Sequence, residues 1–330
     1  MVLLKGKLLK TTMRHLISLK EQSAEDLRTI ISLAARIKAL QKSGKPTDYL
    51  HNQTLLMLFQ KSSTRTRISF EAAMTELGGH GIYIDSRTTQ FSMSDFKDEI
   101  RAVMRFGSAL VFRALKSADV LEAASFNCIP VIDACSEKYH PAQALGDLLT
   151  MAEYSGGIEK IGKIAWLGIE NNVSNTLVLA SAKLGIEVVI AAPEADKESI
   201  DPELNAMAET TGKIGRTPDV PKALAGANFV HTDTWMNMEF FENGHVKPQF
   251  EEEFERRKKV FLPYQLNAKI MDAYAPTAKI MHCMPCHVGY EISRDAIDHK
   301  NSIIFDQAEN RMHIQKAILL WLLEKENVVG

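Results

Sequence analysis

Residues 54–67 read TLLMLFQKSSTRTR, and this stretch predicts both the fold class and the first candidate site. Residues 54–59 form a short, nearly unbroken apolar run, which is typical of a parallel strand buried on both faces of a sheet. Beyond it the hydrophobic period becomes that of a helix, which two glycines then end, at Phe70, Ala73, Met74, Leu77, Gly78 and Gly79. The stretch therefore predicts a strand, a polar turn and a helix, the repeating unit of α/β proteins.

The polar turn at 62–67 is a candidate anion site. At a strand-to-helix junction, free backbone N–H groups and the positive end of the helix dipole favour a phosphate. Two guanidiniums and three hydroxyls add donors that suit phosphate oxygens, from Ser63, Thr64, Arg65, Thr66 and Arg67. The turn has no glycine and no lysine followed by serine or threonine, so it is not a Walker-type nucleotide loop. An ordinary Ser/Thr helix cap with solvated arginines is an equally good interpretation of this stretch alone.

The length and composition of the chain limit the classes of protein to consider. A chain of 330 residues is too long for one typical core and predicts two domains. Its 45% hydrophobic and 24% charged residues are typical of a soluble globular protein, and no apolar run is long enough to span a bilayer. A net charge of −2 gives no support to nucleic-acid binding, so we expect neither nucleic acid nor a membrane as a partner. Residues 1–20 show no secretory signal, and we expect reduced thiols and a cytoplasmic location.

Strands and helices alternate along both halves of the chain. Apolar runs predict strands at 54–59, 81–85, 109–112, 129–134, 164–168, 187–192, 228–233 and 279–282. The glycines at 156 and 157 end a helix, and we place a domain boundary there. We expect an α/β fold of two doubly wound domains, 1–155 and 156–305, each a mainly parallel sheet flanked by helices. Residues 306–330 are expected to form a helix that opens near 310 and packs back on the first domain.

Three polar side chains follow predicted strands of the first half. Arg113 lies at the carboxyl end of a strand, where ligands bind in open α/β sheets, although a surface arginine in a loop is the alternative. Pro141 predicts a helix start, so His140 and Gln143 project from the same first turn and can reach one small ligand. A histidine before a proline is more often a plain cap, but a His and a Gln together can hydrogen-bond a carbonyl and an amide.

The second half lacks a dinucleotide-binding signature. Its first strand is followed by Gly168 alone and by asparagines, so a NAD-binding Rossmann domain is excluded. Asn171 and Asn172 can donate and accept as recognition of an amino acid requires, but turn chemistry is a strong alternative. Asp233, at the end of another strand, is able to pair with a substrate ammonium group. Residues 234–244 carry apolar groups that we expect to be exposed in a mobile covering loop.

Cys283 and Cys286 have the spacing of a metal or redox pair, with His282 and His287 beside them. Zinc binding and thiol redox chemistry are therefore alternatives for this segment. A single pair of cysteines without a second pair is weak support for a structural metal site. We expect neither a metal nor a cofactor.

Taken together, six motifs resemble the aspartate and ornithine carbamoyltransferase family, from about residue 15 to about residue 323. They are Ser63-Thr64-Arg65-Thr66, Arg113, His140-Pro141-Ala142-Gln143, Asn171-Asn172-Val173-Ser174-Asn175, His282-Cys283-Met284-Pro285 and Asp306-Gln307-Ala308-Glu309-Asn310-Arg311. The paired asparagines, an Asp-x-Trp segment and the His-Cys-x-Pro turn are most similar to the ornithine branch.

The resemblance implies transfer of a carbamoyl group from carbamoyl phosphate to the δ-amine of L-ornithine, giving citrulline and phosphate. The carbamoyl phosphate ligands it implies are Ser63, Thr64, Arg65, Thr66, Gln90, Arg113, His140, Gln143, Cys283, Met284 and Arg311, of which Arg113, His140, Gln143 and Cys283 are catalytic. The implied ornithine ligands are Asn171, Asn172, Asp233, Asn237 and Met238. Cys283 and the carbonyl of Met284 would accept bonds from the δ-ammonium group. The family also implies a homotrimer in which Gln90 reaches a neighbouring site.

Three segments depart from the ornithine branch: residues 92–95 lack the basic residue often found there, Val288 and Tyr290 replace the usual Arg and Glu, and residues 237–239 differ in the covering loop. Residues 237–239 read Asn-Met-Glu where that branch usually has Ser-Met-Gly, and Glu239 adds bulk and charge beside the substrate carboxylate. An acylated ornithine, putrescine or another amine is therefore an alternative acceptor. A catalytically inactive binding protein of the same fold is the other alternative, but such a protein should have lost phosphate ligands, and none is lost.

Overall fold

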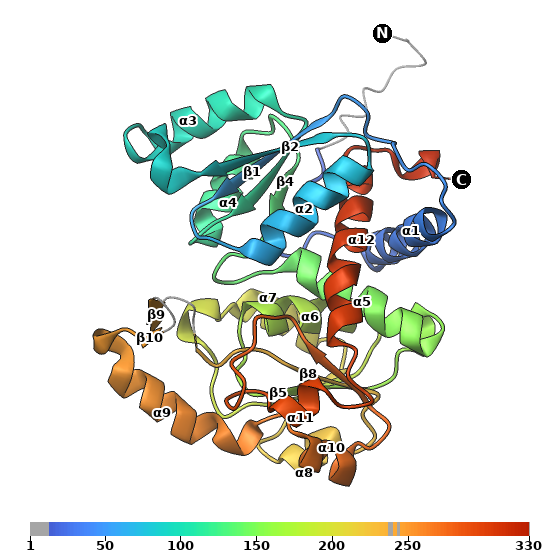
Figure 1. The fold of residues 1–330 in the computed structure, drawn as a ribbon, viewed down its shortest axis with the longest axis vertical. Coiled ribbons are helices and arrows are strands. Elements are labelled where there is room, and N and C mark those ends of the chain that lie inside the picture. Colours follow the sequence, from blue (N-terminus) through green and yellow to red (C-terminus); the bar gives the residue numbers. More distant parts are fainter. Residues whose placement is uncertain (1–12, 237–239, 243–244, 330) are drawn as a thin grey trace.

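A computed structural model describes residues 13–236, 240–242 and 245–329, and the structural statements below concern these residues (Figure 1). The chain folds into two parallel sheets with helices around each, which confirms the predicted α/β class. Among the described residues, no helix combines the length and the apolar character that crossing a membrane requires.

The first sheet has four parallel strands in the order β2-β1-β3-β4. Their bounds are β1 Thr54–Phe59, β2 His80–Asp85, β3 Ala109–Arg113 and β4 Val131–Asp133. The central strand β1 is buried along nearly its whole length, as its apolar run predicts. Its last residue, Phe59, pairs in register with Arg113, so the turn after β1 and the end of β3 lie at the same edge. The helices of this half are α1 Ala24–Lys42, α2 Thr64–Glu76, α3 Phe96–Val103 and α4 Ser117–Ser125.

The second sheet has five parallel strands in the order β11-β8-β5-β6-β7. Their bounds are β5 Ile164–Leu167, β6 Val188–Ala191, β7 Ile214–Arg216, β8 Phe229–Thr232 and β11 Lys279–His282. The sequence did not predict β7, because this edge strand has three residues, a glycine and an exposed arginine, and no apolar run. A short antiparallel pair, β9 Phe241–Glu242 and β10 His245–Val246, was also not predicted. The helices are α6 Asn172–Lys183, α7 Pro202–Glu209, α8 Val220–Leu224, α9 Glu251–Phe261, α10 Ala268–Tyr274 and α11 Arg294–Ile297.

Two helices join the halves: α5, Pro141–Ser155, and α12, Ile304–Leu322. In Figure 1, α12 runs from the second sheet up to the first half and lies beside α5, and it packs on α1, α2 and α5. The predicted start of α12 near residue 310 was wrong, since the helix begins at Ile304. Its buried face carries polar residues such as Gln307 and Asn310, which hide the helical period in the sequence.

One hydrophobic cluster of buried side chains continues from the first sheet through α5, α6 and α12 to the near face of the second sheet. A second cluster fills the far face of the second sheet, under α8 and α10. The continuous cluster fixes the two sheets relative to each other. The carboxyl ends of their strands therefore meet at a defined position.

Candidate active site

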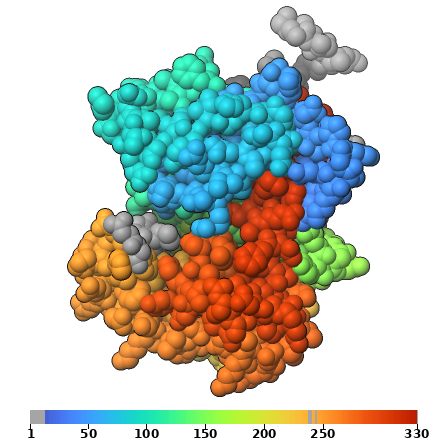
Figure 2. Space-filling view, in the orientation of Figure 1, coloured from blue at the N-terminus to red at the C-terminus, as the bar shows by residue number. Residues whose placement is uncertain are grey.

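The predicted site residues lie where the carboxyl ends of the two sheets face each other. Arg113 ends β3, Asp233 follows β8 and Cys283 follows β11. In Figure 2 the first half, in blue and cyan, lies above the second half, in orange, with the red C-terminal segment between them on this face. Side chains from three separate parts of the chain can therefore contact one ligand.

The candidate anion site is built around Thr66, whose side chain is buried in the first turn of α2. Its Oγ1 accepts hydrogen bonds from Ser63 Oγ at 3.0 Å and from Arg311 Nη2 at 3.0 Å, and Arg113 Nη1 lies at 3.5 Å. The predicted phosphate ligands at 63, 66, 113 and 311 thus come together. Thr64 is exposed at the first position of the helix.

Arg65 connects the halves, because its Nε donates to the carbonyl of Met284 at 3.2 Å. Burial lowers the pKa of Arg65, and the nearby charge of Arg113 lowers it further. Burial likewise lowers the pKa of Arg311 to about 10, with Arg113 and Arg65 adding to the effect. No described acidic residue forms a salt bridge with these three guanidiniums. Positive charges held together in this way favour binding of an anion.

Arg67 does not belong to this site, and its predicted role was wrong. Its guanidinium lies 3.8 Å from the ring centroid of Tyr83, and its Nε lies 3.4 Å from Glu71. Two positions on an α-helix differ by about 200° around its axis, so Arg65 and Arg67 must face opposite sides.

His140 and Gln143 flank the start of α5, and both are buried. Burial lowers the pKa of His140 well below its ordinary value, and the charges of Arg311 and Arg113 add to this, so its imidazole is neutral. Gln143 Nε2 donates to Asp147 at 2.7 Å, one helical turn further on. The amide oxygen of Gln143 thereby faces away from Asp147.

Four buried side-chain atoms at this position have no hydrogen-bond partner among the described residues: Arg113 Nε, His140 Nδ1, Gln143 Oε1 and Arg311 Nε. A buried polar atom without a partner costs about 1–3 kcal/mol, so such atoms are rare except where a ligand or water completes the site. This group includes guanidinium donors, an imidazole and an amide acceptor. It is therefore suited to a small anion that also carries a carbonyl and an N–H group.

On the second half, the carboxylate of Asp233 is held from both sides. Asn171 Nδ2 donates to Asp233 Oδ2 at 2.7 Å, and the Cys283 thiol donates to Oδ1 at 2.9 Å. Asn171 also caps α6, since its Oδ1 accepts from the backbone N–H groups of residues 173 and 174. Both interpretations of this asparagine, turn chemistry and site residue, are therefore compatible with its contacts.

Two groups that were predicted to accept hydrogen bonds from the δ-ammonium group already have hydrogen-bond partners within the chain. Burial, followed by the charge of Asp233, raises the pKa of the Cys283 thiol well above its ordinary value, so Cys283 is a donor here rather than the predicted acceptor. The carbonyl of Met284 accepts from Arg65. Asn172 Nδ2 reaches across to the first half and donates to the carbonyl of Ser136 at 2.7 Å.

The predicted covering loop is only partly described. Asn237, Met238 and Glu239 lie outside the described residues. The expectation of exposed apolar groups was wrong for Trp235 and Met236, which are fully buried, and for Phe240. Trp235 packs with Ile169 and Phe261, so the start of this segment is anchored in the second half.

The alternative of a metal or redox pair requires Cys286 to act together with Cys283. Cys286 lies outside the cluster of potential ligands that the described residues form, which contains Asp233, His282 and Cys283. His282 Nδ1 accepts from the N–H of Met284 at 2.9 Å, and its Nε2 contacts Glu291 at 3.2 Å. Both ring nitrogens of His282 thus have partners within the chain, and the Cys283 thiol keeps its proton.

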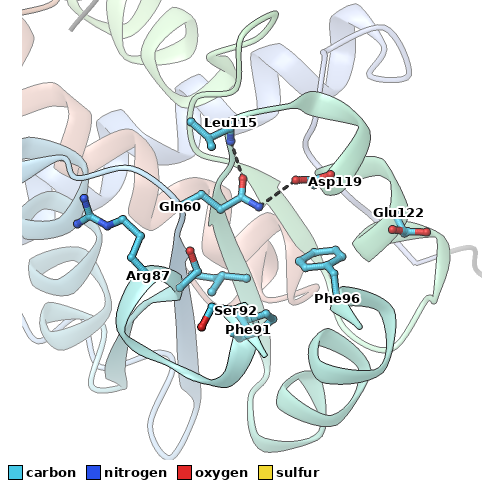
Figure 3. A pocket seen from close by; sticks show the side chains of 10 residues that line it. Gln60, Arg87, Phe91, Ser92, Phe96, Leu115, Asp119 and Glu122 are labelled. Atoms are coloured by element: carbon cyan, nitrogen blue, oxygen red, sulfur yellow. Dashed lines mark hydrogen bonds between the residues drawn. The ribbon is translucent and has the colours of Figure 1, made fainter. Parts of the chain in front are cut away.

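Gln90 begins an exposed 3₁₀ turn, Gln90–Ser92. No hydrogen bond among the described residues joins its side chain to the candidate site. Next to this turn, a cavity of about 410 Å³ lies beyond the carboxyl end of β1, between the turns at 86–92, α3 and α4 (Figure 3). There Gln60 accepts from the N–H of Leu115 at 2.6 Å and donates to Asp119 at 2.9 Å, so both ends of its amide have a partner.

Sequence reasoning missed the buried residues that hold the site residues in place. Asp147 contacts Gln143, His231 and Gln307, which come from α5, β8 and α12. The spacing of Gln143 and Asp147, one helical turn apart, was the available signal. The contacts with His231 and Gln307 join residues far apart in the sequence, and no local pattern predicts them.

Comparisons with known proteins identify one family in both halves of the chain. A family model for the carbamoyl-P binding domain of aspartate/ornithine carbamoyltransferase matches residues 14–153, and the model for the Asp/Orn binding domain matches 161–322. The curated ornithine carbamoyltransferase of Methanospirillum hungatei is 40% identical over 94% of this chain and 99% of its own length. The anabolic enzyme of Pyrococcus furiosus is 39% identical over 93% and 95%. The solved structure of ornithine carbamoyltransferase from Pyrococcus furiosus has a TM-score of 0.85 at 36% identity, covering 96% and 99% of the two chains. That of the anabolic enzyme from Campylobacter jejuni has 0.81 at 35%, covering 94% and 99%.

Proposed function

This chain belongs to the aspartate/ornithine carbamoyltransferase family, and we propose on that premise that it transfers the carbamoyl group of carbamoyl phosphate to L-ornithine. The relatives named above are ornithine carbamoyltransferases, which supports ornithine rather than aspartate as the acceptor. The products are then L-citrulline and phosphate.

The observation that carries the proposal is the group of four buried, unpartnered atoms from Arg113, His140, Gln143 and Arg311. A phosphate group would take the guanidinium donors, together with Ser63, Thr64, Arg65 and Thr66. The carbonyl of carbamoyl phosphate would accept from the neutral imidazole of His140, and its N–H group would donate to Gln143 Oε1. One ligand of this chemistry satisfies all four atoms, which a fully ionised phosphate or carboxylate does not, because it has no donor for Gln143 Oε1.

The same groups account for the transfer step. The neutral δ-amine attacks the carbamoyl carbon, and negative charge develops on the carbonyl oxygen of the tetrahedral intermediate. Arg113, Thr66 and His140 are donors already in place for that charge, and preorganised donors of this kind supply much of the rate enhancement in acyl transfer. When the C–O bond to phosphate breaks, the leaving phosphate takes up the proton that the attacking nitrogen loses, and Arg65 and Arg311 lie ready to neutralise its remaining charge.

We assign the acceptor to the second half. Asp233 would pair with the α-ammonium group, Asn171, Asn172, Asn237 and Met238 would hold the α-amino and α-carboxyl groups, and Cys283 and Met284 would line the path of the δ-amine. Binding would exchange the contacts Cys283–Asp233 and Asn172–Ser136 for contacts with the substrate. The corresponding domains are 1–155 for carbamoyl phosphate and 156–305 for ornithine, with 306–330 returning to the first.

The remaining parts of the proposal concern assembly and location. We propose a homotrimer in which Gln90 completes the site of a neighbouring subunit, and a cytoplasmic location. The exposed position of Gln90, together with the lack of any hydrogen bond from its side chain to the site among the described residues, supports a role in another subunit.

The test is carbamoyl transfer from carbamoyl phosphate to ornithine, acetylornithine, putrescine and aspartate, each assayed with the same preparation. We expect citrulline from ornithine and background product from the other amines. Product from putrescine or acetylornithine alone would replace ornithine as the acceptor. Background with all four amines, in protein that still binds carbamoyl phosphate, would support the inactive binding protein instead.

A further inference from the structure

A buried chain of hydrogen bonds runs from β11 through α12 to the Gln143 side chain. The backbone N–H of His282 donates to Gln307 Oε1 at 2.9 Å, and Gln307 Nε2 donates to Asp147 Oδ1 at 2.7 Å. Gln143 Nε2 donates to the same oxygen of Asp147 at 2.7 Å. Each of these side chains is at most 1% exposed, so water does not compete for the bonds.

The direction of every bond in this chain is determined by its first member. A backbone N–H can only donate, so the amide oxygen of Gln307 must face His282, and its NH₂ group must face Asp147. A carboxylate oxygen with two amide neighbours can only accept, so Gln143 must also present its NH₂ group to Asp147. The oxygen of Gln143 is then the atom left at the ligand position, buried and without a partner.

The other oxygen of Asp147 faces His231. Asp147 Oδ2 lies 3.1 Å from His231 Nε2, Gln307 Nε2 lies 3.0 Å from the same ring nitrogen, and His231 Nδ1 lies 3.1 Å from the carbonyl of Thr232 and must donate to it. The imidazole ring stacks on Trp166, with centroids 4.8 Å apart. Both oxygens of Asp147 therefore have neighbours within the chain, and the two glutamine NH₂ groups share one of them.

We propose that Asp147 and Gln307 are positioning residues that select a carbamoyl group over an acyl group by presenting the Gln143 carbonyl to the carbamoyl NH₂. This inference rests on the proposed function and extends it to the choice of phosphate donor. A carbamoyl phosphate donates an N–H to Gln143 Oε1. An acyl phosphate carries a methyl group at the same place and leaves that buried oxygen without a partner. If the Gln143 amide were reversed, its NH₂ would oppose the carbamoyl NH₂ and the preference would be lost.

The experiment measures binding by calorimetry, so it does not depend on turnover. The probes are phosphonoacetamide and phosphonoacetone, which differ by NH₂ against CH₃ beside the same carbonyl and phosphonate. We expect the full-length wild-type chain to bind phosphonoacetamide at least about tenfold more tightly, the effect of one buried hydrogen bond and one buried unpaired oxygen.

Substitutions at Asp147 separate positioning from packing. Asp147→Leu keeps the branching of the side chain at a larger volume and removes the acceptor, and the ratio of affinities should fall close to one, with phosphonoacetone binding changed little. Asp147→Asn should keep most of the ratio, because its Oδ1 can accept from both glutamines while its Nδ2 donates to His231 Nε2. Thr150→Val, which removes a buried hydroxyl one turn further along α5, is the matched control and should keep the wild-type ratio.

The outcomes are distinct for the two proposals. A wild-type ratio near one, an unchanged ratio in Asp147→Leu, or a lost ratio in a folded Asp147→Asn would each overturn the positioning role. A wild-type ratio of tenfold that falls in Asp147→Leu supports it, even if the wild-type chain carbamoylates none of the four amines. The latter result would refute the proposed transferase function alone.

Discussion

Replacing Arg311 by methionine should make the protein more stable in the absence of ligand and unable to respond to phosphate. Burial lowers the pKa of Arg311 to about 10, with Arg113 and Arg65 nearby. The difference from an ordinary arginine corresponds to about 3 kcal/mol of unfavourable free energy in the folded state. Methionine removes this cost and also the hydrogen bond to Thr66, worth about 1 kcal/mol. The net expected gain is about 2 kcal/mol, because Thr66 keeps its bond from Ser63.

The sign of this effect follows from proton linkage. Folding lowers the pKa of Arg311, so the native state holds that proton less tightly than the unfolded chain does. The unfavourable contribution is therefore fully present at neutral pH and is relieved only as the pH rises through about 10. Near pH 7 the substitution should show its whole effect.

The assay is thermal unfolding in phosphate-free buffer and again with saturating inorganic phosphate. Wild-type protein should gain about 2.7 kcal/mol when phosphate reaches one hundred times its dissociation constant, and Arg311→Met should gain almost nothing. Lys316→Met is the matched control on the same helix, because this buried lysine pairs with Glu76 and Gln41, and its loss should destabilise the protein. A lower melting temperature for Arg311→Met than for wild type without phosphate would refute the reasoning.

Three further predictions concern single groups of the site. Arg65→Ala should lower kcat/KM for carbamoyl phosphate about a hundredfold or more. Arg67→Ala should stay near the wild-type value, because the Arg67 side chain lies against Tyr83. Equal losses in the two variants would show that Arg67 does belong to the site. Asp233→Asn should raise the KM for ornithine at least about tenfold and leave the KM for carbamoyl phosphate nearly unchanged. A change in the KM for carbamoyl phosphate alone would contradict the assignment of Asp233 to the ornithine side of the site. Between about pH 6 and 9, kcat/KM for carbamoyl phosphate should show no ionisation of His140, because burial beside Arg311 lowers its pKa well below that range; a rising limb near pH 6.5 that a His140→Asn variant lacks would disprove this.

The parts of the fold that the sequence predicts well are the buried parallel strands. β1 is apolar along its whole length because helices or strands cover both of its faces, and such runs are visible without any tertiary information. The sequence did not predict β7 and the start of α12, because neither shows a regular pattern of apolar residues. β7 is a short edge strand with little apolar content, and α12 buries Gln307 and Asn310, whose partners lie far away in the sequence.

In the candidate site, too, the sequence predicted some residues and not others. Residues at strand ends, such as Arg113 and Asp233, follow from the rule that ligands bind at the carboxyl edge of parallel strands. The orientation of side chains around a helix did not follow, and both Arg65 and Arg67 were assigned to the anion site although about half a turn of α2 separates their directions. The burial of Trp235 also depends on a distant residue, Phe261, and only the folded chain brings these two together.

The arrangement of charge explains why one site can take two unlike substrates. The guanidiniums of Arg65, Arg113 and Arg311 lie on the side of the first sheet, and the carboxylate of Asp233 lies after β8 in the second. A dianionic phosphate is therefore favoured at one end and repelled at the other, and an ammonium group has the opposite preference. Between them stand groups without net charge, the neutral imidazole of His140 and the protonated thiol of Cys283. Because neither group carries a charge, neither competes with the arginines for a phosphate or with Asp233 for an ammonium group.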